Sequence, residues 1–239
     1  MMSAVIRYRP IMATIANNLQ LVRNRIQAAC AQTGRPADSV TLLAVSKTFP
    51  AVTVRDAFHA GQRWFGENYV QEALDKIAEL ADLREQITWH LIGPLQSNKT
   101  RVVAEHFDWV QSVDRLKIAQ RLSEQRPAHL PPLQVCIQVN TSGEESKSGV
   151  APGEALALAQ AVAALPRLQL RGVMALPAPS PEPAVQAEAL AQVRVVFEQL
   201  RAAGLSLDVL SMGMSADLEA AVAQGSTMVR VGTALFGQR

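Results

Sequence analysis

Short apolar segments alternate with helical patterns along this chain, and this alternation limits the fold more than any other feature. The apolar segments are continuous and seldom alternate with polar residues, which is typical of parallel strands covered on both faces. Eight strands are predicted, at residues 41–46, 63–66, 88–92, 109–113, 133–139, 168–175, 207–211 and 228–231. Helices are predicted between them, at residues 52–60, 70–83, 97–105, 114–125, 152–165, 184–203 and 215–224.

Eight strands alternating with helices in 239 residues favour a closed (β/α)8 barrel over an open doubly wound sheet. The sequence has no GxGxxG pattern at a first strand–helix turn, which weakens the dinucleotide-binding alternative. An additional helix is predicted over Ile11–Gln32, before the first strand, and it ends near Gly34 and Pro36. We therefore expect an α/β fold, a TIM barrel with an extra N-terminal helix, as a single domain over residues 1–239.

The composition is that of a folded protein with a large core, because hydrophobic residues make up 49% of the chain and charged residues 18%. The net charge of +2 comes from scattered residues, so nucleic-acid binding is not expected. No apolar run reaches the ~18 residues of a membrane span, and no leader pattern is present. Cys30 and Cys136 are expected to be reduced core thiols. We expect a cytoplasmic protein without membrane contact.

The loops after the last two strands together predict an anion site. The segment 211–215 leads into a helix with Ser215 as its expected N-cap, and Gly232 and Thr233 follow the last strand. Helix N-termini and exposed amides bind phosphate, and these two loops are the usual phosphate position in a (β/α)8 barrel. Each motif alone is also compatible with an ordinary cap serine or turn glycine, but their combination favours phosphate.

The first strand ends in Lys47, at the edge of the barrel where active sites are built. An amine among apolar walls and other cations is a nucleophile for carbonyl groups, although strand-end lysines also commonly extend to solvent. An amine beside a phosphate site fits two ligands, a phosphosugar aldehyde or pyridoxal 5′-phosphate (PLP). Arg230 helps to distinguish these two ligands. A permanent cation placed against the pyridine nitrogen of PLP would keep that nitrogen unprotonated, and a phosphosugar has no such nitrogen. A phosphate clamp or a structural ion pair is the alternative role for Arg230.

Other polar residues near strand ends carry less information. His90 is interpreted as a hydrogen-bonded core residue in preference to an acid or base. The four histidines have no metal-ligand spacing, and no serine lies in a GxSxG motif, so we assign neither a metal site nor catalytic residues. The loop 177–183 is rich in proline and is either a lid or a solvated loop. Transient PLP binding at Lys147 is left open.

Several segments, taken together, resemble the pyridoxal phosphate homeostasis protein family. The resemblance covers nearly the whole chain, and the combination of segments is far more specific than any one of them. It implies a single barrel of PLP fold type III, similar to the N-terminal domain of alanine racemase. The matching segments are Ala44–Lys47, Phe65–Tyr69, Trp89–Lys99, Ser146–Gly149, Leu170–Met174, Ser211–Asp217 and Val229–Gly237.

The same resemblance implies PLP as the cofactor and assigns contacts with it. Lys47 matches the lysine that forms the Schiff base, and Arg230 matches the arginine at the pyridine nitrogen. The remaining positions are the phosphate contacts Ser215, Gly232 and Thr233, and the further cofactor contacts Asn68 and Ser211.

The resemblance also implies a PLP carrier that acts in vitamin B6 homeostasis without an established reaction. Racemases of this fold type use a lysine and a tyrosine from a second domain, whereas this chain ends soon after the eighth strand and its tyrosines are Tyr8 and Tyr69. We expect a monomer that binds PLP without turnover, with PLP-dependent apoenzymes as candidate partners. The alternative is a racemase-like PLP enzyme acting on a small amino acid, and a phosphosugar aldolase or isomerase is the third choice.

Overall fold

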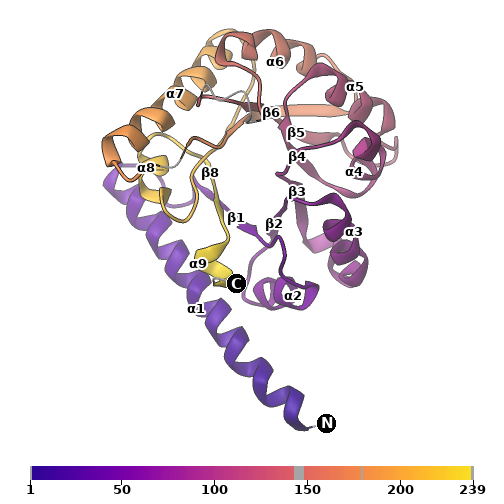
Figure 1. The fold of residues 1–239 in the computed structure, drawn as a ribbon, viewed down its shortest axis with the longest axis vertical. Coiled ribbons are helices and arrows are strands. Elements are labelled where there is room, and N and C mark those ends of the chain that lie inside the picture. Colours follow the sequence, from indigo (N-terminus) through magenta and orange to yellow (C-terminus); the bar gives the residue numbers. More distant parts are fainter. Residues whose placement is uncertain (1, 143–147, 179, 238–239) are drawn as a thin grey trace.

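Eight parallel strands form a closed barrel in sequence order, and helices surround it (Figure 1). The structure is a computed structural model that describes residues 2–142, 148–178 and 180–237. Strand β1 pairs with both β2 and β8, which closes the barrel and places Leu43 beside Arg230. The predicted TIM barrel is therefore confirmed. The strands are β1 Thr41–Val45, β2 Trp64–Glu67, β3 Thr88–Leu91, β4 Trp109–Val113, β5 Leu133–Val139, β6 Leu168–Ala175, β7 Val209–Ser211 and β8 Met228–Val231.

Helices follow the strands as predicted, but several boundaries differ, and the short α9 after the last strand was not predicted. Helix α1 begins at Met2, not at Ile11, so Pro10 lies inside it; β7 begins two residues later than expected, and α8 begins three residues later. The α-helices are α1 Met2–Gln32, α2 Ala51–His59, α3 Val70–Glu79, α4 Thr100–His106, α5 Leu116–Gln125, α6 Ala155–Ala163, α7 Pro183–Ala202, α8 Leu218–Ala223 and α9 Thr233–Phe236. Short 3₁₀ helices are η1 Ala81–Gln86, η2 Ser97–Lys99 and η3 Pro152–Glu154.

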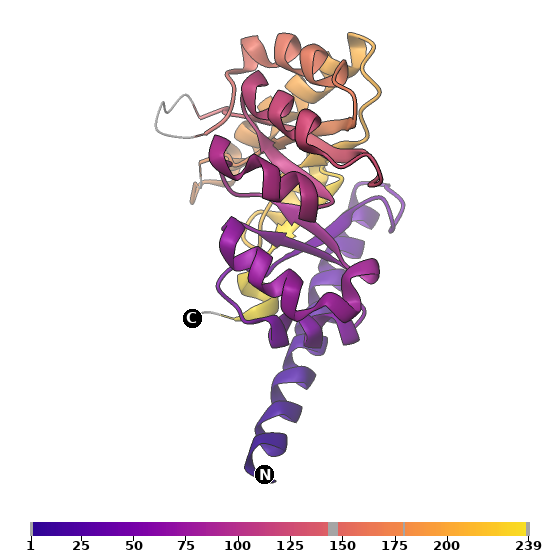
Figure 2. The same ribbon diagram turned by 90° about the vertical axis from the view of Figure 1, so that its right-hand side faces the viewer.

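Helix α1 is additional to the strand–helix repeat and packs on one side of the barrel. It runs beside α8 and α9, and its N-terminal end projects away from the barrel body (Figures 1 and 2). Among the described residues, no helix is both long enough and apolar enough to cross a membrane.

The core has two parts, because strand residues face either the helices or the inside of the barrel. The larger part fills the layer between strands and helices. The smaller part joins residues from strands around the whole barrel, so it must lie inside: Leu43, Trp109, Cys136, Met174, Val209 and Met228. Cys30 and Cys136 are both buried and free, as predicted, and burial raises the pKa of the Cys136 thiol to about 12.

Candidate functional site

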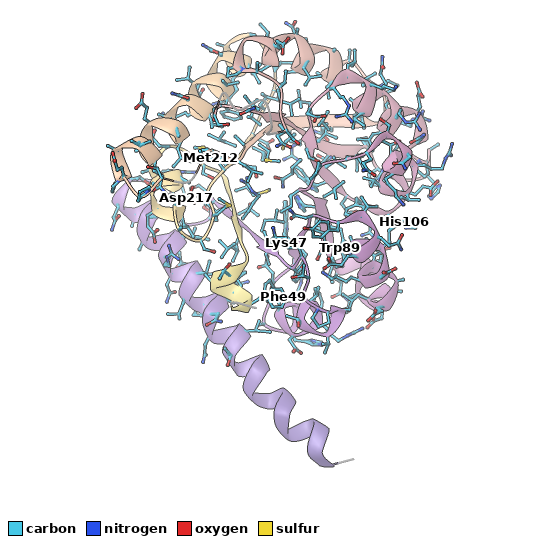
Figure 3. All side chains as sticks on the ribbon, in the orientation of Figure 1. Lys47, Phe49, Trp89, His106, Met212 and Asp217 are labelled. Atoms are coloured by element: carbon cyan, nitrogen blue, oxygen red, sulfur yellow. The ribbon has the colours of Figure 1, made fainter. Side chains whose placement is uncertain are left out.

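A cavity of about 480 Å³ opens at the C-terminal ends of the strands. Its size is within the ~300–1,000 Å³ that is typical of small-molecule sites. Figure 3 shows Lys47 near the middle of the barrel, with Met212 and Asp217 across from it on the side of α8. Six of the seven residues predicted as cofactor contacts line the cavity, namely Lys47, Asn68, Ser215, Arg230, Gly232 and Thr233.

Lys47 reaches the cavity because the side chains at the end of β1 alternate between its two faces. Val45 and Lys47 line the cavity, whereas Ser46 between them is fully buried behind it. The chain then turns sharply, and the Phe49 N–H donates to the Ser46 carbonyl at 3.1 Å. Thr48 in this turn has a φ of 63°, in the left-handed region that a β-branched residue seldom adopts. Lys47 is thus fixed at the rim of the barrel in a tight turn.

Arg230 supplies a buried cation on the floor of the cavity, with only 3% of its surface exposed. Its guanidinium donates to the Ser211 carbonyl at 2.7 Å, to the Ser211 hydroxyl at 2.8 Å and to the Ala175 carbonyl at 2.8 Å. Burial lowers the pKa of Arg230 to about 10, so the side chain stays charged at neutral pH. It has no acidic partner in these contacts and is held in place by neutral oxygens.

Ser211 is the one predicted contact that does not line the cavity. It is fully buried behind Arg230, and its hydroxyl donates to Gln111 Oε1 at 2.6 Å. Gln111 therefore uses Nε2 to donate to His90 Nδ1, at 2.8 Å, and the His90 ring stacks on Trp109 with centroids 4.9 Å apart. Arginine can only donate, so the Ser211 hydroxyl accepts from Arg230 and donates its own proton to Gln111 Oε1. The Gln111 amide then presents its N–H group to His90. This buried chain orients Arg230, and it confirms His90 as a hydrogen-bonded core residue.

His90 gives the fold a predictable pH dependence. Burial lowers its pKa well below the ordinary value of 6.5, so below that pH the unfolded chain binds a proton that the folded protein does not. The contribution of His90 to stability is complete above 6.5 and falls below it, by up to ~1.4 kcal/mol per pH unit. We expect His90→Asn, which keeps an acceptor for Gln111, to lose this component of the pH dependence between about pH 7 and about pH 5.

The measurement is urea unfolding of both proteins at each pH. The exposed His129→Asn serves as the control and should keep the wild-type pH dependence. An unchanged pH dependence in His90→Asn would show that His90 does titrate normally in the fold.

The loop after β7 is shaped by Gly213, not by a serine cap. Gly213 has a φ of 94°, and a Cβ there would lie 2.4 Å from the Ala221 Cβ of α8. The prediction of Ser215 as N-cap is wrong, because the chain makes one more turn before α8 begins with Asp217 as its N-cap residue. The Asp217 carboxylate accepts the Met214 N–H at 2.5 Å within that turn, which leaves Ser215 on the cavity wall.

The loop after β8 completes this side of the cavity. Gly232 is the N-cap residue of α9, and a Cβ on it would lie 3.1 Å from the Val45 carbonyl oxygen of β1. The first N–H groups of a helix have no acceptor within the helix, so donors are available where Gly232 and Thr233 line the cavity. Gly213 thus lets the loop after β7 pack closely against α8, and Gly232 lets the loop after β8 pack closely against β1.

Helix α1 braces both of these loops, which the sequence did not indicate. Arg25 donates to the Ser215 carbonyl at 3.0 Å and also forms an ion pair with Glu219 at 2.7 Å. Asn18 donates to the Leu235 carbonyl of α9 at 2.9 Å. These contacts join residues about 190 or more positions apart, so no local sequence pattern predicts them.

Asn68 connects the cavity to a neighbouring one of about 350 Å³. Its Oδ1 atom is buried and has no hydrogen-bond partner among the described residues, so it can accept from a ligand. The neighbouring cavity also includes Leu176 and Pro177, so the proline-rich loop forms part of its wall. Tyr69 is 58% exposed and does not line the cavity that holds Lys47. Lys147 lies outside the described residues.

Comparison with known proteins identifies the class. A family model described as "Alanine racemase, N-terminal domain" matches residues 13–239. An alanine racemase of Clostridium difficile has the same fold over 95% of this chain and 57% of its own, with a TM-score of 0.76 and 14% identity. The chain is therefore a barrel of the alanine racemase N-terminal class.

Closer relatives define the family within that class. A protein of Pseudomonas aeruginosa named pyridoxal phosphate homeostasis protein is 63% identical over 95% of this chain and 97% of its own length. The structure of PipY from Synechococcus elongatus with PLP bound is 41% identical, with a TM-score of 0.81, and covers 93% of this chain and all of that one. This chain belongs to the pyridoxal phosphate homeostasis protein family, as its sequence motifs indicated.

Proposed function

We propose that this protein binds PLP in the cavity at the end of the barrel and acts in intracellular PLP homeostasis. The observation that carries the proposal is that Lys47, Arg230 and the two glycine-shaped loops converge on one cavity, although Lys47 lies far from the others in the sequence. A relative that is 41% identical has been solved with PLP bound. PLP supplies an aldehyde, a pyridine nitrogen and a phosphate, and the cavity offers a group for each.

The residues present fit this cofactor. Lys47 would hold the aldehyde carbon as a Schiff base, and the buried Arg230 would face the pyridine nitrogen. The loops that carry Ser215, Gly232 and Thr233 would donate to the phosphate, as helix N-termini and exposed amides commonly do. The buried Oδ1 of Asn68 would accept a hydrogen bond from the ligand. Ser211 would act indirectly, by orienting Arg230.

The same arrangement supports a carrier in preference to an enzyme. A positive charge at the pyridine nitrogen weakens the ring as an electron sink, and the exposed Tyr69 is not placed as a second base. We extend the proposal to a monomer of one domain over residues 1–239 that acts in the cytoplasm and passes PLP to apoenzymes. Turnover of an amino acid that depends on Lys47 would instead favour a racemase-like activity.

The test is a titration of the purified protein with PLP, followed by visible absorbance after removal of free ligand. A Schiff-base band that borohydride bleaches is expected at one equivalent per chain. Pyridoxal, which lacks the phosphate, should bind far more weakly because it does not use the loops after β7 and β8. A protein that stays colourless with PLP would contradict the proposal.

The brace from α1 gives a prediction for the phosphate loops. Arg25→Met removes both the donor to the Ser215 carbonyl and the ion pair with Glu219, so we expect weaker binding of pyridoxine 5′-phosphate, which has an alcohol in place of the aldehyde. The dissociation constant should rise roughly threefold to tenfold, as the loss of one hydrogen bond worth about 0.5–1.5 kcal/mol implies. Arg23→Met is the control, because Arg23 lies on the same helix but donates to the Gly61 carbonyl instead. Equal affinities for the two variants would mean that α1 does not shape the site.

A further inference from the structure

A buried ion cluster lies directly behind Lys47, on the helix-facing side of β1 and β2. The Lys76 ammonium of α3 lies 2.8 Å from the Glu67 carboxylate and 2.7 Å from the Glu72 carboxylate. The side chains of Glu67 and Lys76 are 0% and 5% exposed. Burial raises the pKa of Glu67 while the Lys76 ammonium opposes that rise. Buried ion pairs contribute little net stability as a rule, so the position of this cluster needs another explanation.

The cluster holds the backbone on both sides of Lys47. Before it, the Lys76 ammonium donates to the Ser46 carbonyl at 2.7 Å, and the Ser46 hydroxyl donates to Glu67 Oε1 at 2.6 Å. After it, the Thr48 N–H donates to Glu72 Oε1, the oxygen that also accepts from Lys76. One network therefore fixes both residues that flank Lys47.

The flanking turn needs such a restraint, because Thr48 is held in an unfavourable conformation. A φ of 63° at a β-branched residue costs free energy and persists only where its surroundings enforce it. The charged Glu72 acceptor for the Thr48 N–H enforces it from one side. From the other side, the Phe49 ring packs on Phe236 of α9 with centroids 5.1 Å apart. The turn thus has one geometry, which sets the direction in which Lys47 leaves the strand.

We propose that Glu67, Glu72 and Lys76 are positioning residues for Lys47, which fix its backbone so that its amine meets the ligand aldehyde in one orientation. This inference rests on the proposed function. In the step concerned, the Lys47 nitrogen bonds to the aldehyde carbon and loses two protons, and the aldehyde oxygen leaves with them as water. The cluster touches neither the phosphate loops nor Arg230. It should therefore affect this covalent step and leave non-covalent binding of the same ring and phosphate intact.

Glu72→Met is the most direct test, since it removes the acceptor of the Thr48 N–H from a half-buried position and leaves the inner Glu67–Lys76 pair in place. The rate of Schiff-base formation with PLP should fall roughly tenfold, in the range that small misplacements of a reacting group produce. The dissociation constant of pyridoxine 5′-phosphate should stay within about twofold of wild type. Glu79→Met, on an exposed position of the same helix, should change neither quantity.

A second variant tests the inner pair itself, in case the loss of Glu72 alone does not move the Lys47 backbone. Glu67→Gln combined with Lys76→Met removes the two buried charges together and leaves only the half-buried Glu72 carboxylate without the Lys76 ammonium. We expect the same selective loss for PLP, with thermal stability recorded in parallel. An unchanged PLP rate in both variants would overturn the inference, and so would an equal weakening of both ligands, which indicates a merely structural role. If the wild-type protein forms no Schiff base with PLP, the proposed function itself is wrong. That result is distinct from an unchanged rate in the variants.

Discussion

Lys47→Ala is expected to lose the visible absorbance of the PLP-loaded protein and to form no adduct with borohydride. The substitution removes the only lysine nitrogen that lines the cavity in the part of the chain that the structure describes. Phosphate and ring contacts would remain, so PLP should still bind, with an affinity lower by roughly two orders of magnitude, or about 2.8 kcal/mol. Pyridoxine 5′-phosphate has no aldehyde, and its affinity should be nearly unchanged. Absorbance and calorimetric titrations of both ligands measure the difference.

Lys99→Ala is the matched control, because Lys99 is exposed on the same face of the barrel but outside this cavity. It should show the wild-type band and affinity. A Schiff-base band that persists in Lys47→Ala would assign the covalent anchor to another lysine, and Lys147 would be the next one to test. A parallel loss of pyridoxine 5′-phosphate binding would instead show that Lys47 supports the cavity non-covalently.

Gly213→Ala is expected to have the second large effect, on stability and phosphate binding together. A side chain at a φ of 94° costs about 1–2 kcal/mol, and the contact of 2.4 Å with the Ala221 Cβ adds about 1–3 kcal/mol. Relief of that contact would shift the loop that carries Ser215, and the Gly213 carbonyl that accepts the Arg230 N–H at 2.9 Å would move with it. Urea unfolding and titration with pyridoxine 5′-phosphate measure the two losses.

Gly204→Ala separates backbone strain from steric contact. Gly204 has a φ of 91°, but nothing lies within 4 Å of a Cβ placed on it. It should therefore lose only the backbone component of about 1–2 kcal/mol and keep the wild-type affinity for pyridoxine 5′-phosphate. If Gly213→Ala is no less stable than Gly204→Ala and binds as tightly, the close approach of the β7 loop to α8 does not shape the site.

The barrel and the cavity wall could be predicted from the sequence because their signals are local. Continuous apolar runs mark strands buried on both faces, and the barrel brings their C-terminal ends together. Lys47, Gly232 and Thr233 were therefore identified from their place at strand ends. The error at Ser215 has a local cause as well, since Asp217, two residues later, occupies the N-cap position of α8.

The supports of the site could not be predicted, because they depend on side chains that meet across the fold. Gln111 lies two residues after Trp109, so strand alternation predicts that both side chains point into the barrel. Its hydrogen-bond partner Ser211, however, is 100 residues away in the sequence. The sequence around Lys76 does not distinguish it from other helix lysines. Only the folded barrel places its ammonium beside Glu67 and the Ser46 carbonyl. Ser211 was assigned to the cofactor by its motif, yet the structure places it behind Arg230.

Peptide mapping after borohydride reduction of the PLP-loaded wild-type protein tests the central claim most directly. Reduction fixes the Schiff base as a stable secondary amine, so mass spectrometry can locate it on a single residue. We expect one adduct per chain, on the peptide that contains Lys47. An adduct confined to any other lysine, or no adduct on protein saturated with PLP, would contradict the account.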